Sequence, residues 1–303
     1  MTAQKSLSPR AWAELLLLSF IWGASFLSIR VALDEVPVMS AVAHRVFWAA
    51  LILWGYVWLR GITIPRSAHI WGAFFVMGLL NNAVPFSLMA WGQLHIETGL
   101  TSIFNAATAI FGVVVAAMVF SDERLTANRA IGVIIGFAGV VVAIGPAHLM
   151  QFDIRSMAQI AVLLGTLSYA FAGAWARRTL SHLPPQIAAA GMLTGSSIIM
   201  VPLAFYMDGP PQLALQGDTW LAIAYFAIIA TAGAYLLYYR VLSMAGSGNL
   251  MLCTLLIVPV AITLGAVVLG ETLAPRALLG FAILALGLLI LDGRILRVLR
   301  KSH

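Results

Sequence analysis

The chain has 303 residues, of which 62% are hydrophobic and only 9% are charged, and its formal net charge is +6. Soluble globular domains are about half apolar and about a quarter charged, so this composition excludes a soluble domain and predicts an integral membrane protein. The basic residues lie between apolar runs and at the C-terminus, not on an aromatic and basic face, which argues against nucleic acid as a partner.

Ten apolar runs are long enough to cross a bilayer, which takes about 20 mostly apolar residues. They predict an all-α integral membrane protein with ten transmembrane helices. In chain order the runs are Ala11–Ile29, Met39–Leu59, Ala68–Ala90, Gly99–Phe120, Thr126–Gly145, Ser156–Ala176, Gln186–Met207, Thr219–Val241, Asn249–Leu269 and Arg276–Leu296. The first run follows Lys5 and Arg10 as a cleaved signal peptide would, but its repeat partner Ser156–Ala176 predicts that it is retained.

Lysine and arginine residues are concentrated in alternate connections, and this bias predicts the orientation. With the N-terminus inside, thirteen are cytoplasmic: Lys5, Arg10, Arg60, Arg66, Arg124, Arg129, Arg177, Arg178, Arg240, Arg294, Arg297, Arg300 and Lys301. Three, Arg30, Arg155 and Arg276, are then external, and Arg45 lies near the outer end of the second run. Because cytoplasmic segments of membrane proteins hold the excess of positive charge, both termini are predicted to be cytoplasmic.

The chain also repeats itself. Glu123 and Glu271 lie 148 positions apart, and the same offset pairs Leu125 with Leu273, Gly132 with Gly280, Gly139 with Gly287 and Gly145 with Gly293. An offset of 147 pairs Arg30 with Arg177, Leu33 with Leu180 and Pro37 with Pro184. We therefore expect a first five-helix repeat at 1–148 and a second at 149–303, which ends in a short basic tail. Because five is odd, the second repeat is predicted to have inverted topology.

Inverted repeats are typical of secondary transporters, in which two similar halves open a midplane site alternately to each side. A membrane scaffold that transports nothing is the alternative, but a scaffold has little need of polar residues inside the membrane. An intramembrane enzyme would need a nucleophile with a base or a metal cluster, and the sequence contains no HExxH, no GxSxG and only one cysteine, Cys253. The sequence therefore predicts a transporter that is not an enzyme and holds no cofactor or metal.

Three motifs resemble one family. The segment Ser19–Phe26 is similar to the "WG(S/A)xF" opening of the EamA family in the drug/metabolite transporter superfamily. Ser121–Leu125 with Gly132 and Gly139, and Leu269–Leu273 with Gly280 and Gly287, resemble its "xxExL…G…G" signature, and Pro259 stands where the family has its proline. The resemblance covers essentially the whole chain and is greatest to YddG-type amino-acid exporters. It implies ten helices, cytoplasmic termini, a bacterial inner membrane location, and export of amino acids or other small metabolites.

Polar and aromatic residues within the runs are candidates for a substrate cavity. The eight candidates are Trp22, Asn81, Asn82, Asn105, Thr108, Tyr169, Tyr235 and Thr254. Pro85 removes a backbone hydrogen bond and frees carbonyls near Leu80 to Asn82, and an unwound stretch at this depth must be buried in protein or line a cavity. The alternatives stay open, since the two asparagines could satisfy only this kink, and small polar residues also hold helices together.

The charged residues within or beside the runs are given structural roles. Glu14 is expected at the membrane interface, Glu123 and Glu271 are expected to cap or pair at helix ends, and His44 and Arg45 are expected to extend to the headgroups, with an outer gate as the alternative.

An aromatic cavity without buried charge predicts neutral, mostly apolar amino acids, such as aromatic ones, as substrates, and disfavours anions. A nucleotide-sugar or other metabolite or drug carrier is the alternative, and a nucleotide-sugar carrier would need cations in the cavity. No titrating group is placed near mid-membrane, which predicts a facilitator or exchanger. The expected partners are a small-molecule substrate and the lipid bilayer, and the oligomeric state is left open, a monomer included.

Overall fold

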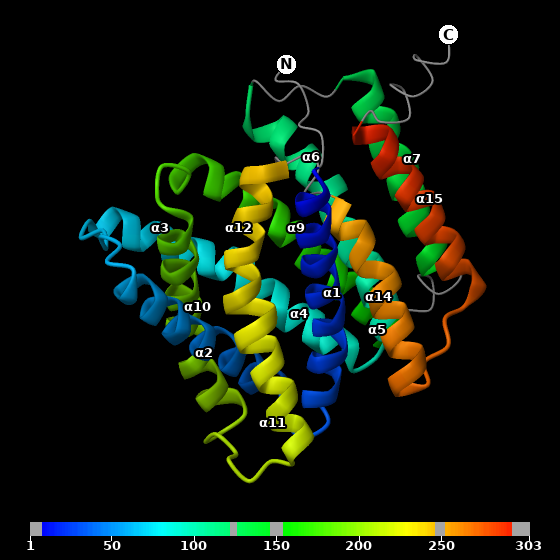
Figure 1. The fold of residues 1–303 in the computed structure, drawn as a ribbon. Helices are drawn as coiled ribbons and strands as arrows, with labels where there is room; N and C mark the ends of the chain where they lie inside the picture. The colour runs from blue at the N-terminus through cyan, green and yellow to red at the C-terminus, as the bar shows by residue number, and fades with distance from the viewer. Residues whose placement is uncertain (1–7, 122–125, 146–153, 246–251, 293–303) are drawn as a thin grey trace.

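The computed structural model describes residues 8–121, 126–145, 154–245 and 252–292, and within these ranges every regular element is a helix (Figure 1). The elements of the first half are α1 (Pro9–Ala32), α2 (Val38–Leu59), α3 (Ala68–Gly78), η1 (Leu79–Ala83), α4 (Val84–Gln93), α5 (Thr98–Ala106), α6 (Thr108–Val119) and α7 (Ala127–Ile144). Those of the second half are α9 (Ile154–Thr179), α10 (Pro185–Met207), α11 (Gly217–Ala224), η2 (Tyr225–Gly233), α12 (Ala234–Ala245), α14 (Leu252–Leu269) and α15 (Pro275–Asp292).

Seven helical segments of the described chain are long and apolar enough to cross a membrane. Three shorter apolar helices, within α7, α14 and α15, accompany them. Large apolar side chains such as Trp58, Met118 and Leu221 are exposed on the outside of the bundle, as a lipid-facing surface requires. The prediction of an all-α membrane protein is confirmed, and every predicted run overlaps one of these helical segments.

The third and eighth runs each contain a π-helix, and these two π-helices correspond in the repeat. The predicted unwound stretch before Pro85 stays helical but widens into η1, while the unpredicted η2 interrupts the equivalent run of the second half. A π-turn shifts the backbone hydrogen bonds and leaves carbonyls to side-chain donors. Ser168 Oγ donates to the Leu80 carbonyl at 2.7 Å, and Trp22 Nε1 donates to the Ala230 carbonyl at 3.1 Å.

Repeat-related helices make corresponding contacts in the two halves of the chain. The α1 helix packs on α14 and on the α11–η2–α12 segment, and its repeat partner α9 packs on α5, on α6 and on the α3–η1–α4 segment. Repeat partners also pack on each other, α2 on α10 and α7 on α15. In the first of these pairs Ser40 near the start of α2 bonds Asp208 just beyond the end of α10, so the two helices are antiparallel. Antiparallel repeat partners are what an inverted repeat requires.

Glycines of the duplicated signature form the contact between α7 and α15, which lie side by side at one edge of the bundle (Figure 1). A Cβ on Gly139 would lie 2.5 Å from the backbone nitrogen of Leu284, and one on Gly287 would lie 2.5 Å from that of Gly136. Only glycine lets the two backbones approach this closely, as in other small-residue contacts between membrane helices.

Candidate functional site

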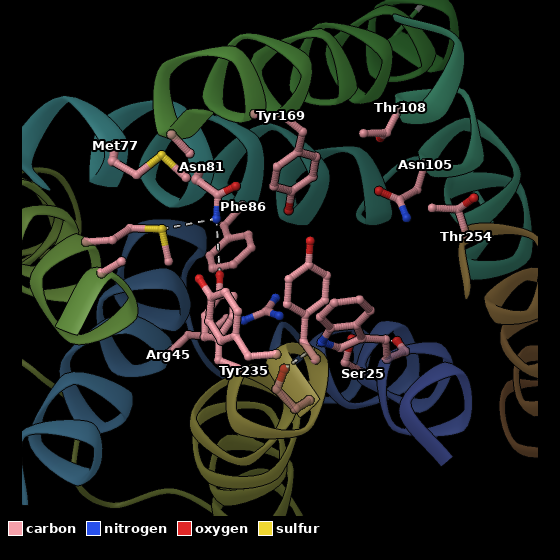
Figure 2. Close-up of a pocket in the computed structure, with 18 of the residues that line it drawn as sticks. Ser25, Arg45, Met77, Asn81, Phe86, Asn105, Thr108, Tyr169, Tyr235 and Thr254 are labelled. Atoms are coloured by element: carbon pink, nitrogen blue, oxygen red, sulfur yellow. Dashed lines mark hydrogen bonds between the residues drawn. The ribbon is translucent and has the colours of Figure 1, made fainter. Parts of the chain in front are cut away.

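A cavity of about 680 Å³ lies in the middle of the bundle and is lined from both halves (Figure 2). Its wall is built from α1, α2, α3, η1, α4, α5 and α6 of the first half and from α9, α10, η2, α12 and α14 of the second. The α7–α15 pair contributes none of the lining residues. Of the five repeat-related pairs of helical segments, four therefore enclose the cavity and one stands outside it.

The cavity is open at one end and closed at the other. Its mouth lies at the connection between α9 and α10, where Arg177, Ser181 and Pro185 are exposed lining residues. At the far end Phe26 and Gln93 are buried, and Gln93 Nε2 donates to the Phe26 carbonyl at 2.9 Å. A solute in this structure can thus enter from one face only, the one predicted to be cytoplasmic.

Seven of the eight residues predicted from the sequence line this cavity: Trp22, Asn81, Asn105, Thr108, Tyr169, Tyr235 and Thr254. Asn82 does not belong to the lining, and the prediction for this residue was wrong. It is fully buried behind Asn81, where its Nδ2 donates to Ser196 Oγ at 3.0 Å and its Oδ1 accepts from the Tyr235 hydroxyl at 3.3 Å. The two asparagines point about 100° apart around the helix, so Asn81 lines the cavity while Asn82 meets Ser196 of α10.

Asn81 and Tyr235 form one polar edge of the cavity. Asn81 Nδ2 lies 3.1 Å from the Tyr235 hydroxyl and 3.3 Å from Met192 Sδ. The asparagine comes from the π-helix η1 and the tyrosine follows the π-helix η2, so the two widened turns place polar groups against each other across the repeat axis. Figure 2 shows both side chains with Arg45 beside them.

A second polar group lies on the other side of Tyr169 in Figure 2, formed by Asn105, Thr108 and Thr254. The fourth run was predicted as one helix, but it breaks at Ala107 between α5 and α6, beside the first two of these residues. The Thr108 hydroxyl oxygen is buried and has no hydrogen-bond partner among the described residues. A buried polar atom that lines a cavity and lacks a partner is suited to bind a solute.

Aromatic rings form much of the wall between the two polar groups. The rings of Trp22 and Tyr238 lie 5.7 Å apart, those of Phe86 and Tyr169 lie 6.5 Å apart, and Tyr239 packs edge-on against Tyr238. Tyr239 lies in the cavity wall as well. Aromatic faces suit a solute with a flat apolar body.

Arg45 overturns the expectation that it extends to the headgroups. Its side chain lines the cavity, where Nε donates to Thr231 Oγ1 at 2.9 Å and the guanidinium carbon lies 3.8 Å above the ring of Phe86. The preceding residue, His44, lies on the other side of α2 against Trp48 and Trp220. The cavity therefore contains a cationic side chain, contrary to the prediction that it holds no buried charge.

The sequence could not reveal which way Arg45 points. It lies seven residues after the start of α2, so it is about 10 Å along the helix, a depth from which arginine can still reach the headgroups. Neighbouring residues on a helix differ by about 100° in direction, so only the packing of α2 decides that His44 faces outward and Arg45 inward. A signal was present in the repeat, because Arg45 pairs at an offset of 147 with Met192, which also lines the cavity.

The remaining charged candidates lie outside the cavity. Glu14 pairs with Arg10 and Arg240, and Glu271 accepts hydrogen bonds from the backbone nitrogens of Thr98 at 2.9 Å and Gly99 at 3.4 Å. Glu271 thus caps α5 of the other half, where an N-terminal carboxylate is favoured. Glu123 lies outside the described residues. Within the described chain no three His, Cys, Asp or Glu side chains group as metal ligands would.

Three curated relatives match most of the chain. The chain is 27% identical over 302 residues to a "Probable terminal-alkyne amino-acid exporter" of Streptantibioticus cattleyicolor, covering 98% of this chain and 97% of that protein. It is 25% identical over 297 residues to a "Probable amino-acid metabolite efflux pump" of Salmonella typhimurium, covering 91% and 92%. It is 24% identical over 268 residues to the "Uncharacterized inner membrane transporter YedA" of Escherichia coli, covering 87% and 84%.

The fold is also that of a solved crystal structure. The two superpose with a TM-score of 0.65 at 17% sequence identity, over 93% of this chain and 96% of the other. The model of the EamA-like transporter family matches the chain twice, at residues 11–145 and at residues 156–291, one match in each half. With two matched repeats arranged around one central cavity, the chain belongs to the EamA-like transporter family of membrane proteins.

Proposed function

We propose that this transporter exports small neutral amino acids with apolar or aromatic side chains, by alternating access, across a bacterial inner membrane. In this proposal the seven long helices and the three shorter ones all span the bilayer, which gives ten spans with both termini in the cytoplasm. The two halves are inverted repeats that divide near residue 148. The named relatives support amino acids as cargo and an inner membrane as the location.

The observation that carries the proposal is the central cavity with one open and one closed end. A space of about 680 Å³ falls within the range of pockets that enclose a single small molecule. Both halves contribute to its wall, so a movement of one half against the other would close the mouth beside Arg177 and open the end beside Gln93. Secondary transporters with inverted repeats use such movements around a midplane site.

The contents of the cavity favour an amino acid over a larger carrier substrate. The aromatic wall matches an apolar side chain, and the polar groups around Arg45 and around Asn105 match the two polar ends of a zwitterion. A nucleotide sugar carries at least two negative charges, and of the two lining arginines only Arg45 lies away from the exposed mouth, where Arg177 is. Because Arg45 can attract anions, the binding measurements on this side chain include 3-phenylpropionate and phenyl phosphate.

Counterflow in liposomes tests the proposal. Purified protein is reconstituted, the vesicles are loaded with unlabelled solute, and uptake of a labelled trace is followed for phenylalanine, tryptophan, leucine, lysine, a purine nucleoside and a cationic dye. We expect exchange of phenylalanine, tryptophan and leucine and none of lysine, because the lining carries Arg45 and no Asp or Glu of the described chain. Exchange of the dye or the nucleoside without exchange of any amino acid would overturn the proposal.

A further inference from the structure

We infer that Arg45 anchors the carboxylate of the transported solute, and that the site selects a carboxylate joined to an apolar body without requiring an amino group. This inference rests on the proposed function and narrows its substrate class. Neutral zwitterions then form one part of a larger set that includes the corresponding deaminated acids. Four observations carry it, and each concerns residues that line the cavity.

The first observation is how Arg45 is held. Thr231 Oγ1 accepts from Arg45 Nε at 2.9 Å and itself donates to the Phe226 carbonyl at 2.7 Å. The ring of Phe86 covers one face of the guanidinium at 3.8 Å. Arg45 is thus fixed by one nitrogen and one face, and its two terminal nitrogens have no hydrogen-bond partner in the described part of the chain. Two adjacent N–H groups of a fixed guanidinium match the two oxygens of a carboxylate.

The second observation is the missing counter-charge. The residues that line the cavity include Arg45 and Arg177 but no Asp or Glu, and none of the ion pairs between described residues involves Arg45. A cation inside the membrane is costly unless it is paired or hydrated. A bound carboxylate supplies the negative partner for Arg45, whereas a solute with a net positive charge is repelled by Arg45 and finds no carboxylate in the described lining.

The third observation is that the opposite polar group carries no charge. Asn105, Thr108 and Thr254 offer amide and hydroxyl groups, and the Thr108 hydroxyl is buried without a partner among the described residues. Such groups accept a hydrogen bond from an ammonium as readily as they donate one to another oxygen. The site can therefore bind the amino group of an amino acid, but the described lining has no carboxylate that would make the amino group necessary for binding.

The fourth observation is the asymmetry between the halves. The repeat partner of Arg45 is Met192, which lines the cavity with a thioether and lies 3.3 Å from Asn81 Nδ2. Of these two repeat-related positions only Arg45 can bind an anion, so a solute has one orientation in the site. A single arginine deep in the cavity also favours one singly charged group over a phosphate, whose charge near neutral pH is about −1.5 to −2.

Binding to the purified full-length chain tests the anchor directly. Isothermal titration compares four ligands with the same phenyl body: phenylalanine, 3-phenylpropionate, phenethylamine and phenyl phosphate. We expect 3-phenylpropionate to bind within about threefold of phenylalanine, and phenethylamine to bind at least about tenfold more weakly. Tighter binding of phenyl phosphate than of either carboxylate would overturn the carboxylate assignment, and tighter binding of phenethylamine would overturn the anchor.

Three variants separate the anchor from general damage. Arg45→Gln should weaken binding of both carboxylates by about 10- to 100-fold, Arg45→Lys should restore part of that loss, and Arg178→Gln, which removes an exposed arginine outside the lining, should bind as the wild type does. Gel filtration and far-UV circular dichroism check that each variant is folded. An Arg45→Gln variant that is folded and binds as tightly as the wild type would overturn the inference.

The two proposals fail in different ways. If the wild type exchanges phenylalanine in liposomes and Arg45→Gln does so with an unchanged KM, the anchor is wrong and the proposed function stands. If the wild type neither exchanges nor binds any amino acid or phenyl carboxylate, both are wrong. Loss of phenethylamine binding together with carboxylate binding in Arg45→Gln would also overturn the anchor, because removal of a cation cannot weaken the binding of another cation electrostatically.

Discussion

Trp22 is the residue whose removal tests the cavity wall most simply. Its ring packs on Tyr238 at 5.7 Å and its Nε1 donates to the Ala230 carbonyl at 3.1 Å. Trp22→Ala removes both contacts and most of the aromatic surface offered to a solute at this position. We expect the KM for phenylalanine exchange to rise about tenfold, because an aromatic contact contributes about 0.5–1.5 kcal/mol beyond the area that it buries.

The matched control is Trp58→Ala on α2. Trp58 is 80% exposed on the outside of the bundle and does not line the cavity. Trp58→Ala should leave the KM for phenylalanine unchanged. A rise in KM confined to Trp22→Ala would therefore locate the solute beside α1. Equal KM values in the two variants and the wild type would contradict the placement of substrate against Trp22.

Part of the polar and aromatic lining of the cavity was accessible to sequence reasoning, because polar and aromatic residues in the middle of an apolar run need a reason to be there. Trp22, Tyr169 and Asn105 were found in this way, and the structure places all three on the cavity wall. Whether they bind substrate stays a prediction. Arg45 and Asn82 were misplaced for one physical reason: residue spacing gives depth along a helix, whereas the direction of a side chain around it depends on which neighbouring helix packs there.

At the scale of elements, the contact between α7 and α15 provides a sharp test. A Cβ at position 139 would lie 2.5 Å from the Leu284 nitrogen, which belongs to a helix backbone and cannot move aside alone. Gly139→Ala should therefore separate the two helices despite the gain of about 1 kcal/mol in helix propensity. We expect a lower thermal unfolding midpoint in detergent.

Gly112→Ala on α6 is the control for this substitution. No atom lies within 4 Å of the Cβ that it would add, so it should keep or raise the unfolding midpoint through helix propensity alone. An unfolding midpoint for Gly139→Ala equal to or above that of Gly112→Ala would show that the α7–α15 contact does not depend on the glycine.

The helical segments could be predicted from run length, because the bilayer demands about 20 apolar residues wherever a chain crosses it. Their irregularities could be predicted only in part. Pro85 predicted a departure from α-helix geometry in the third run, because a proline lacks the N–H that donates a hydrogen bond within a helix. No proline marks η2, which packs on α1 and α2, or the break at Ala107 between α5 and α6, which pack on α9, and run length does not reveal such tertiary contacts.

At the scale of the whole molecule, an ion pair joins the two halves at the closed end of the cavity. Arg155 Nη2 at the start of α9 lies 2.9 and 2.7 Å from the carboxylate oxygens of Glu97, which precedes α5. The cavity mouth lies near Arg177 at the other end of α9. Separation of the halves at the closed end would break this pair. Glu97→Gln should therefore favour the opposite conformation, by up to about fivefold for a partly exposed pair worth about 1 kcal/mol or less.

A cysteine at the closed end reports on this equilibrium. Cys253, the single cysteine, is replaced by serine, and Ile29, which lines the cavity near Phe26, is replaced by cysteine. Labelling from outside with an impermeant maleimide should be faster in Glu97→Gln than in the parent. The control is Arg30→Gln, which breaks a pair with Asp34 just beyond the end of α1, within one half of the chain. Equal acceleration by both variants would indicate a general charge effect and contradict the role of the pair.

Energy coupling is also a property of the whole molecule, and it follows from which groups reach the cavity. Among the described residues that line it there is no Asp, Glu or His, and Glu14 is instead paired with Arg10 and Arg240 outside it. A proton-coupled exporter needs a titrating group that each side of the membrane reaches in turn. We therefore predict that phenylalanine moves down its own gradient by facilitated diffusion or exchange.

The test applies a pH gradient to proteoliposomes while potassium and valinomycin hold the membrane potential at zero. Initial uptake of labelled phenylalanine should be unchanged, because a zwitterion carries no net charge and the described lining contains no Asp, Glu or His that could take up a proton. Accumulation of phenylalanine above its external concentration under the pH gradient alone would contradict the prediction. Glu14→Gln and a Gln variant of His95, which lies just beyond α4 against Trp91, would then show which group carries the proton. The responsible variant would abolish accumulation and retain counterflow.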